Sequence, residues 1–356
     1  MDFALLTELT ETPGISGREE RVRALVAEQF AQLKATTTTD AMGNLIGHLP
    51  GQGPRVALMA HMDEIGFLVS KIEAEGFIRV MPVGGVDARI FGAQQVVVHG
   101  RADLPGVVGS VPPHLMKKEE GKEAKPVLAM EEGFIDLGLP AEETARLVTV
   151  GDPVTFATGS WENETTIFAK ALDDRVGLFV MLQAVRKTQK RDCDLFLIAS
   201  CQEEYGLRGA GPAVHAVAPQ VTLVLEGTVA SDTPGLKLPT NISATSQGGG
   251  PEIRLTDRAM ISDRTLADCL IGLAQKNNLP HQIIVKKTGT TDAAAGQTAA
   301  AGTRACAVSV PVRYIHAPIG VVRKADVAHT VDLIAAFLEN VSLLTPATGA
   351  TVSLNA

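Results

Sequence analysis

The chain has 356 residues, of which 45% are hydrophobic, and a formal net charge of −8. This length predicts two domains, and the acidic balance excludes nucleic acid and anionic membranes as partners. Four scattered cysteines, the absence of a signal-peptide pattern and the absence of a membrane-length apolar run indicate a reduced, cytoplasmic protein.

The first segments predict a helix and two strands. Ser16, followed three residues later by Glu19, matches a capping box. Apolar residues then recur at helical spacing between Val22 and Phe30. Strand-like segments follow near residues 35–40 and 45–49.

The apolar run 55–60 predicts a buried strand that ends at His61. In an extended segment His61 and Asp63 lie on the same side. This spacing suits a histidine ligand whose orientation a neighbouring carboxylate fixes. A single histidine after a strand is more often structural, but the acidic residues that follow weaken that interpretation.

Residues 70–164 have a different character, with frequent glycines and short valine-rich runs. This pattern predicts a small β-barrel domain inserted into an outer domain made of residues 1–69 and 165–356. The charged run 117–125 is typical of a surface loop.

Carboxylates also occur just before the next predicted helix and just after the next predicted strand. Asp173 and Asp174 precede an apolar helix, where an N-cap role is a serious alternative to metal binding for either aspartate. The buried strand 195–199 leads to Glu203 and Glu204. Neighbouring side chains on an extended backbone point in opposite directions, so we expect these two glutamates to have different roles.

The rest of the chain continues the alternation of helices and strands. A strand over 221–225 ends in Glu226, and His316 lies in a loop after the last core strand, 306–310. Helices are predicted over 207–217, 265–277 and 326–344.

This order predicts an α/β fold with a mixed, largely parallel sheet and helices on both faces, together with the inserted barrel. In such sheets the functional site lies beyond the carboxyl ends of the strands. His61, Glu203, Glu204 and Glu226 directly follow predicted strands at that edge, and Asp173 and His316 come from loops that could lie beside them.

Two imidazoles and several carboxylates suit zinc or cobalt, and manganese is also compatible. One ion would use about four ligands, whereas a bridging Asp173 would hold two ions about 3.5–4 Å apart, with His61 and His316 on opposite ions. A hydroxide shared by the two metals would then be the nucleophile, with Glu203 as the general base.

Four motifs in order resemble the M42 family of metallo-aminopeptidases, which includes the tetrahedral and glutamyl aminopeptidases. The motifs are His61-Met62-Asp63-Glu64, Leu172-Asp173-Asp174-Arg175, Gln202-Glu203-Glu204-Tyr205 and Tyr314-Ile315-His316-Ala317. The resemblance covers nearly the whole chain. It implies an aminopeptidase acting on short peptides, with two divalent metals per subunit, and an inserted domain that assembles dimers into a dodecamer.

The same resemblance implies a role for each site residue. His61, Asp173, Glu204, Glu226 and His316 would be metal ligands, Glu203 the general base and Asp63 the support of His61. The first aspartate of the second acidic motif is the family's ligand, which favours Asp173 over Asp174.

One departure from the family pattern leaves more than one possibility for the type of bond that the protein cleaves. Many relatives have aspartate at the position of Glu226, and glutamate resembles the pattern of related carboxypeptidases. The alternatives are therefore a metal-dependent carboxypeptidase or deacylase, and beyond these a glycosidase or a non-catalytic assembly protein. A preference for peptides that begin with glutamate would need a basic group in the substrate pocket, for which Arg89, Arg208 and Arg313 are candidates. Asp232 could be a metal ligand that compensates for the change at Glu226.

Overall fold

The computed structural model describes residues 1–110, 112, 114, 129–238 and 241–344. Its largest element is an 11-stranded mixed sheet, in which nine strands follow the order β1-β2-β12-β3-β13-β16-β17-β11-β10, and β14 joins β15 to β16. The strands are β1 Thr36–Thr39, β2 Leu45–Leu49, β3 Arg55–His61, β10 Trp161–Glu162, β11 Thr166–Ala169, β12 Asp194–Ser200, β13 Val221–Val229, β14 Glu252–Thr256, β15 Gln282–Val285, β16 Arg304–Arg313 and β17 Gly320–Arg323.

Parallel pairing is concentrated at the centre of this sheet, where β12, β3, β13 and β16 lie side by side. The flanking strands β2 and β17 are antiparallel to them. The four central strands are almost entirely buried, because helices cover both faces. The prediction of a mixed α/β sheet is therefore confirmed.

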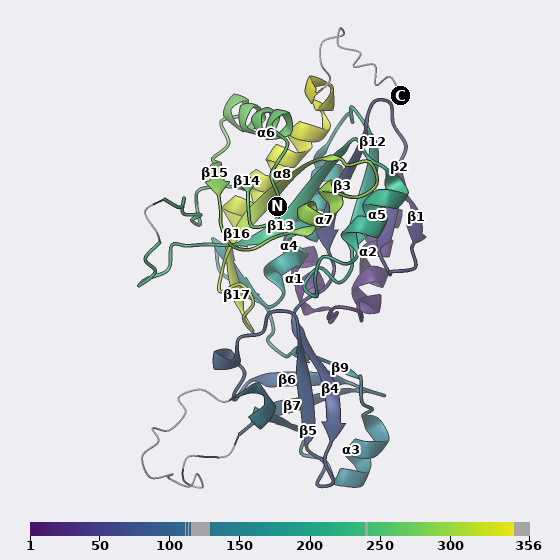
Figure 1. The fold of residues 1–356 in the computed structure, drawn as a ribbon, viewed down its shortest axis with the longest axis vertical. Coiled ribbons are helices and arrows are strands. Elements are labelled where there is room, and N and C mark those ends of the chain that lie inside the picture. Colours follow the sequence, from purple (N-terminus) through teal and green to yellow (C-terminus); the bar gives the residue numbers. More distant parts are fainter. Residues whose placement is uncertain (111, 113, 115–128, 239–240, 345–356) are drawn as a thin grey trace.

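The helices divide between the two faces of the sheet (Figure 1). Alternate residues of β3 explain the division, since Val56 and Leu58 join one apolar core while Ala57 and Met59 join the other. The first core contains α1 Ala4–Glu11, α2 Glu20–Gln32, α4 Leu172–Lys187, α6 Arg264–Lys276 and α8 Lys324–Leu338, and the second contains α5 Ala210–Val217 and α7 Asp292–Gln297.

A closed barrel forms a second lobe at one end of the molecule (Figure 1). Its order is β4-β5-β8-β7-β6-β9, and it has its own apolar core. The elements are β4 Gly66–Ile72, β5 Ile78–Val83, β6 Gln95–His99, β7 Asp103–Gly109, β8 Phe134–Asp136, β9 Pro153–Phe156 and helix α3 Ala141–Leu147. The predicted inserted barrel is confirmed, and its strands lie between Gly66 and Phe156. The charged run 117–125 lies outside the described residues.

The predicted capping box before α2 is wrong. Helix α2 begins at Glu20, and the Ser16 hydroxyl donates to Asp63 rather than to a helix amide. Glu19 accepts from the backbone N–H groups of Gly17 and Gln202. Both side chains are used in tertiary contacts, which the local spacing of the motif does not report.

Three predicted boundaries also differ from the structure. Helix α5 begins at Ala210, because Leu207 has the left-handed φ of 58°. Strand β16, Arg304–Arg313, extends beyond the predicted last core strand, 306–310, and is followed by the short strand β17. Helix α8 ends at Leu338, and residues 341–344 form a short 3₁₀ helix. No helix in the described part of the chain is both long and apolar enough to cross a bilayer.

Candidate metal centre

Asp173 lies between two histidines that are 255 residues apart in the sequence. Its Oδ1 is 3.3 Å from Nε2 of His61, and its Oδ2 is 3.3 Å from Nε2 of His316. Glu226 lies 3.9 Å from the first imidazole, and Glu204 lies 3.2 Å from the second. The five residues predicted as ligands therefore converge on one place.

They form two groups that share Asp173. One group contains His61, Asp173 and Glu226, and the other contains Asp173, Glu204 and His316. Within each group the possible ligand atoms lie within 4.8 Å of one another. Each group offers nitrogen and oxygen donors of the kind that bind zinc, cobalt or manganese.

Strand pairing brings the first group together. Met59 and Val224 are directly opposed on the parallel strands β3 and β13, and both side chains belong to the same apolar core. His61 and Glu226 each lie two residues further along, so they emerge on the same face. Glu226 is thus inside β13, whereas the sequence pattern had ended this strand at residue 225.

The neighbouring carboxylate, Asp174, has a structural role. Its Oδ1 accepts from the N–H of Gly177 at the start of the regular part of α4, and its Oδ2 accepts from the N–H of His61. Asp174 is fully buried, whereas the Asp173 side chain is 13% exposed. Of the two aspartates for which an N-cap role was an alternative, Asp174 is therefore the one that bonds to the start of the helix.

Glu203 and Glu204 lie on a turn rather than on extended backbone, so the premise of alternating directions is wrong. Strand β12 ends at Ser200, and Gln202 adopts a left-handed φ of 55°. The carbonyl of Glu203 then accepts from the N–H groups of Gly206 and Leu207.

Asp63 connects this turn to His61. Its Oδ1 accepts from the N–H of Glu203 and its Oδ2 from the N–H of Glu204. Nδ1 of His61 lies 3.0 Å from the carbonyl oxygen of Asp63 and 3.4 Å from its Oδ1. The contact that orients the imidazole is thus chiefly with the Asp63 backbone.

The buried charges alter the acidity of the centre. Burial raises the pKa values of Glu203, Glu204 and Glu226 above those of ordinary glutamates. Burial would lower the pKa of His316, but hydrogen bonds to Asp173 and Glu204 raise it to about 11. The neighbouring carboxylates thus favour positive charge at this centre.

Sequence reasoning missed a buried ion pair beside the centre. Both carboxylate oxygens of Glu64 lie 2.7 Å from Nζ of Lys170. Lys170, Asp173, Glu204 and His316 line the same hollow, whose volume of ≈ 20 Å³ is close to the room that one water molecule needs. A lysine inside the apolar segment 167–172 was the available signal.

The other polar candidates from the sequence have different partners. Arg313 pairs with Asp232 at 2.7 Å, so neither residue belongs to the centre. Arg89 pairs with Asp87, whereas Arg208 is exposed. Of the three arginines considered for an acidic preference, two are therefore engaged in ion pairs.

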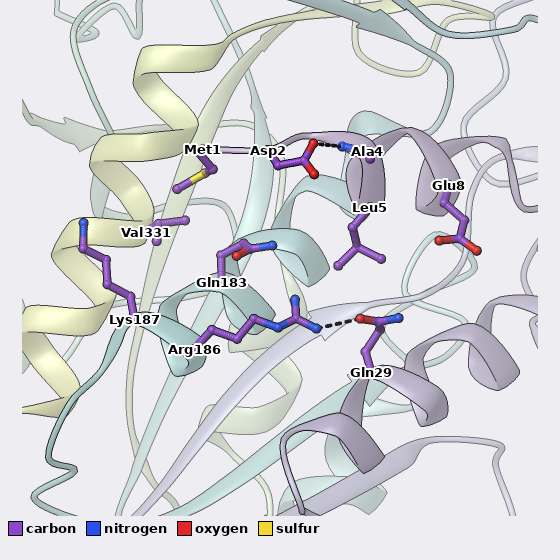
Figure 2. A pocket seen from close by; sticks show the side chains of 10 residues that line it. All are labelled: Met1, Asp2, Ala4, Leu5, Glu8, Gln29, Gln183, Arg186, Lys187 and Val331. Carbon is purple, nitrogen blue, oxygen red and sulfur yellow. Dashed lines mark hydrogen bonds between the residues drawn. The ribbon is translucent and has the colours of Figure 1, made fainter.

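A larger hollow, of ≈ 700 Å³, lies among helices α1, α2, α4 and α8. Figure 2 shows Arg186 donating to Gln29 across it. None of the predicted site residues lines this hollow, so its size is no guide to the chemistry of the candidate ligands.

Comparison with known proteins identifies relatives over almost the full chain. The family model for M42 glutamyl aminopeptidase matches residues 43–333. The chain is 32% identical over 350 residues to lysyl aminopeptidase of Pyrococcus furiosus, covering 95% of this chain and 97% of that protein.

Two solved structures extend this similarity to the fold. An aminopeptidase from Desulfurococcus kamchatkensis is 36% identical, with 98% of each chain covered and a TM-score of 0.91. The TET1 peptidase of Pyrococcus horikoshii is 32% identical, with coverage of 95% and 99% and a TM-score of 0.83. The latter is described as assembling into a tetrahedron or a large octahedral shell.

Proposed function

This chain belongs to the M42 family of peptidases, and we propose that it removes N-terminal residues from short peptides with two divalent cations at the centre described above. His61, Asp173, Glu204, Glu226 and His316 would hold the cations, with Asp173 shared between them. Zinc or cobalt fits these donors best, and manganese is also compatible.

The observation that carries this proposal is the position of Asp173 between two groups of possible ligands, which share it. A second observation tests whether the residues fit a cation. The buried Oε1 of Glu226 has no hydrogen-bond partner among the described residues, although buried carboxylate oxygens normally have one. A coordinated cation would satisfy this oxygen.

Bound cations would polarise the peptide carbonyl and lower the pKa of the attacking water. The proposed role of Glu203 is to accept the proton of this water and transfer it to the amine that leaves. Burial raises the pKa of Glu203 in the metal-free chain. Asp63 would hold the imidazole of His61 and the backbone of Glu203 in place.

We also propose that residues 70–164 form the assembly domain of a homo-oligomer, with residues 1–69 and 165–356 as the catalytic domain. The assembly described for the Pyrococcus horikoshii relative supports this proposal. The expected product is a dodecamer built from dimers. Multi-angle light scattering of the purified chain, and of a variant lacking the barrel, would measure the assembly state.

The experiment that tests the activity is a digest of a peptide panel before and after chelation, with metal content measured in parallel. Mass spectrometry should show that free peptides shorten from the N-terminus and that N-acetylated copies remain intact. Loss from the C-terminus would favour the carboxypeptidase alternative, which the glutamate at position 226 keeps open. Full activity after complete metal removal would refute the metal-dependent proposal.

Glu203→Gln tests the general base separately. The change removes the proton acceptor but keeps the size of the side chain, and we expect a loss of about 10²–10⁴-fold in kcat. Metal content should remain that of the wild type, because Glu203 is not a proposed ligand. Glu20→Gln is a suitable control, since Glu20 is exposed and lies outside the centre.

A further inference from the structure

The turn that presents Glu203 and Glu204 is held by side chains from three distant segments. Four consecutive N–H groups, those of residues 201–204, donate to side-chain oxygens. Asn44 accepts the first, Glu19 the second, and Asp63 the third and fourth, at distances between 2.9 and 3.1 Å.

We propose that Glu19 is a positioning residue for this turn, which places Glu203 for proton transfer. This inference rests on the proposed function of Glu203. Among the described residues, Glu19 forms no hydrogen bond or ion pair with a proposed ligand. It acts through the N–H of Gln202, the residue immediately before Glu203.

The backbone of the turn explains why such a support is needed. Gln202 has a left-handed φ of 55°, a conformation that is unfavourable for a residue with a side chain. Such conformations persist when surrounding contacts determine them. The bond from the Gln202 N–H to Oε1 of Glu19, at 3.0 Å, is a contact of this kind.

The other contacts of Glu19 make it a rigid support. Oε1 also accepts from the N–H of Gly17 at 2.7 Å, which fixes the carboxyl against its own loop. In the same loop Ser16 donates to Asp63, the second support of the turn. Glu19 is only 3% exposed, so water does not compete effectively for these bonds.

The test compares metal-loaded wild type with Glu19→Ala, Glu19→Gln and the exposed-site control Glu20→Ala. A displacement of about 1 Å at a catalytic group can cost about 10²-fold in rate. We therefore expect Glu19→Ala to lower kcat by about 10–100-fold at full metal occupancy, with KM unchanged. Metal affinity should also fall, because Glu204 lies on the same turn. Glu19→Gln keeps the acceptor oxygen and should restore kcat, and Glu20→Ala should behave as wild type.

Wild-type kcat in Glu19→Ala, or equal losses in the alanine and glutamine variants, would overturn the proposal. A second measurement uses hydrogen exchange of the backbone amides, read by mass spectrometry with fragmentation to single residues. The amides of 202–204 should exchange faster in Glu19→Ala than in wild type, whereas those of the barrel should not change. Unchanged exchange at 202–204 would also overturn the proposal.

Hydrogen exchange also covers two other outcomes. If Glu19→Ala does not fold, the Gln202 amide of wild type should still be strongly protected, and rapid exchange there would overturn the inference. If wild type cleaves no peptide in the panel, the proposed function fails, while the exchange data still decide whether Glu19 holds the turn.

Discussion

Glu19→Gln should stabilise the metal-free protein at pH 8 and have little effect at pH 5. Burial, followed by the nearby charge of Asp63, raises the pKa of Glu19 from its ordinary value of 4.5 to about 7. The wild-type protein must therefore keep an unfavourable buried charge above this pH. Glutamine retains the acceptor oxygen without the charge.

The sign and size of the effect follow from proton linkage. Below pH 4.5 the carboxyl is protonated in both the folded and the unfolded chain, so it contributes no pH dependence. Between pH 4.5 and 7 the unfolded chain loses its proton first, and the free energy of unfolding falls as the pH rises. The difference between the two pKa values, at about 1.4 kcal/mol per pH unit, gives about 3 kcal/mol above pH 7.

The assay is thermal unfolding in chelator from pH 5 to pH 8.5, at one protein concentration because assembly also changes the melting temperature. The advantage of Glu19→Gln should grow with pH and level off near pH 8. Adding zinc should reduce it, because nearby cations favour the carboxylate form of Glu19. An equal advantage at pH 5 and pH 8, or none at pH 8, would refute this reasoning, and Glu20→Gln is the exposed control.

Three further predictions concern other contacts. Asp173→Asn should weaken metal affinity, measured by titration. The loss should exceed the 10–100-fold that is typical when a residue that only hydrogen-bonds to a metal ligand is changed. Lys170→Met should lower the free energy of urea unfolding by up to about 3–5 kcal/mol, because the buried Glu64 then keeps only its longer ion pair, at 3.5 Å, with Arg175; adding Glu64→Gln should recover much of this loss. Arg21→Ala should change the melting temperature little, since its pair with Asp103 is largely exposed and contributes less than about 1 kcal/mol.

Local sequence patterns predict that His61, Glu204 and Glu226 meet at one edge of the sheet, whereas the roles of Asp173 and His316, which come from loops, follow from the family resemblance. Short apolar runs identify the central strands, and ligand-type side chains occur at or just beyond their ends. Parallel pairing of β3 with β13 then aligns His61 with Glu226. The periodic patterns of strands and helices are local, so a single sequence reveals them.

The supports of the site could not be predicted in this way. Ser16 and Glu19 fit a capping box locally, but their partners are Asp63 and Gln202, which are 47 and 183 residues away. The direction of Glu203 depends on one left-handed residue, Gln202, which no propensity identifies. Long-range hydrogen bonds override local preference at these positions.

The distribution of basic residues separates two kinds of buried carboxylate. Glu64 is paired with Lys170, and Glu252 is paired with Arg254 and Lys286. In these pairs, basic residues of the same chain offset the cost of burying the carboxylate charge.

At the centre the pattern is different. Asp173, Glu204 and Glu226 form no ion pair with lysine or arginine in the part of the chain that the structure describes, and their charged neighbours within 4 Å are the two imidazoles. Three such carboxylates would repel one another in a poorly hydrated site, and the two imidazoles can balance two of them only while both hold an added proton. The folded chain therefore requires either bound protons or external cations there. Donor groups arranged around a shared aspartate favour the cations.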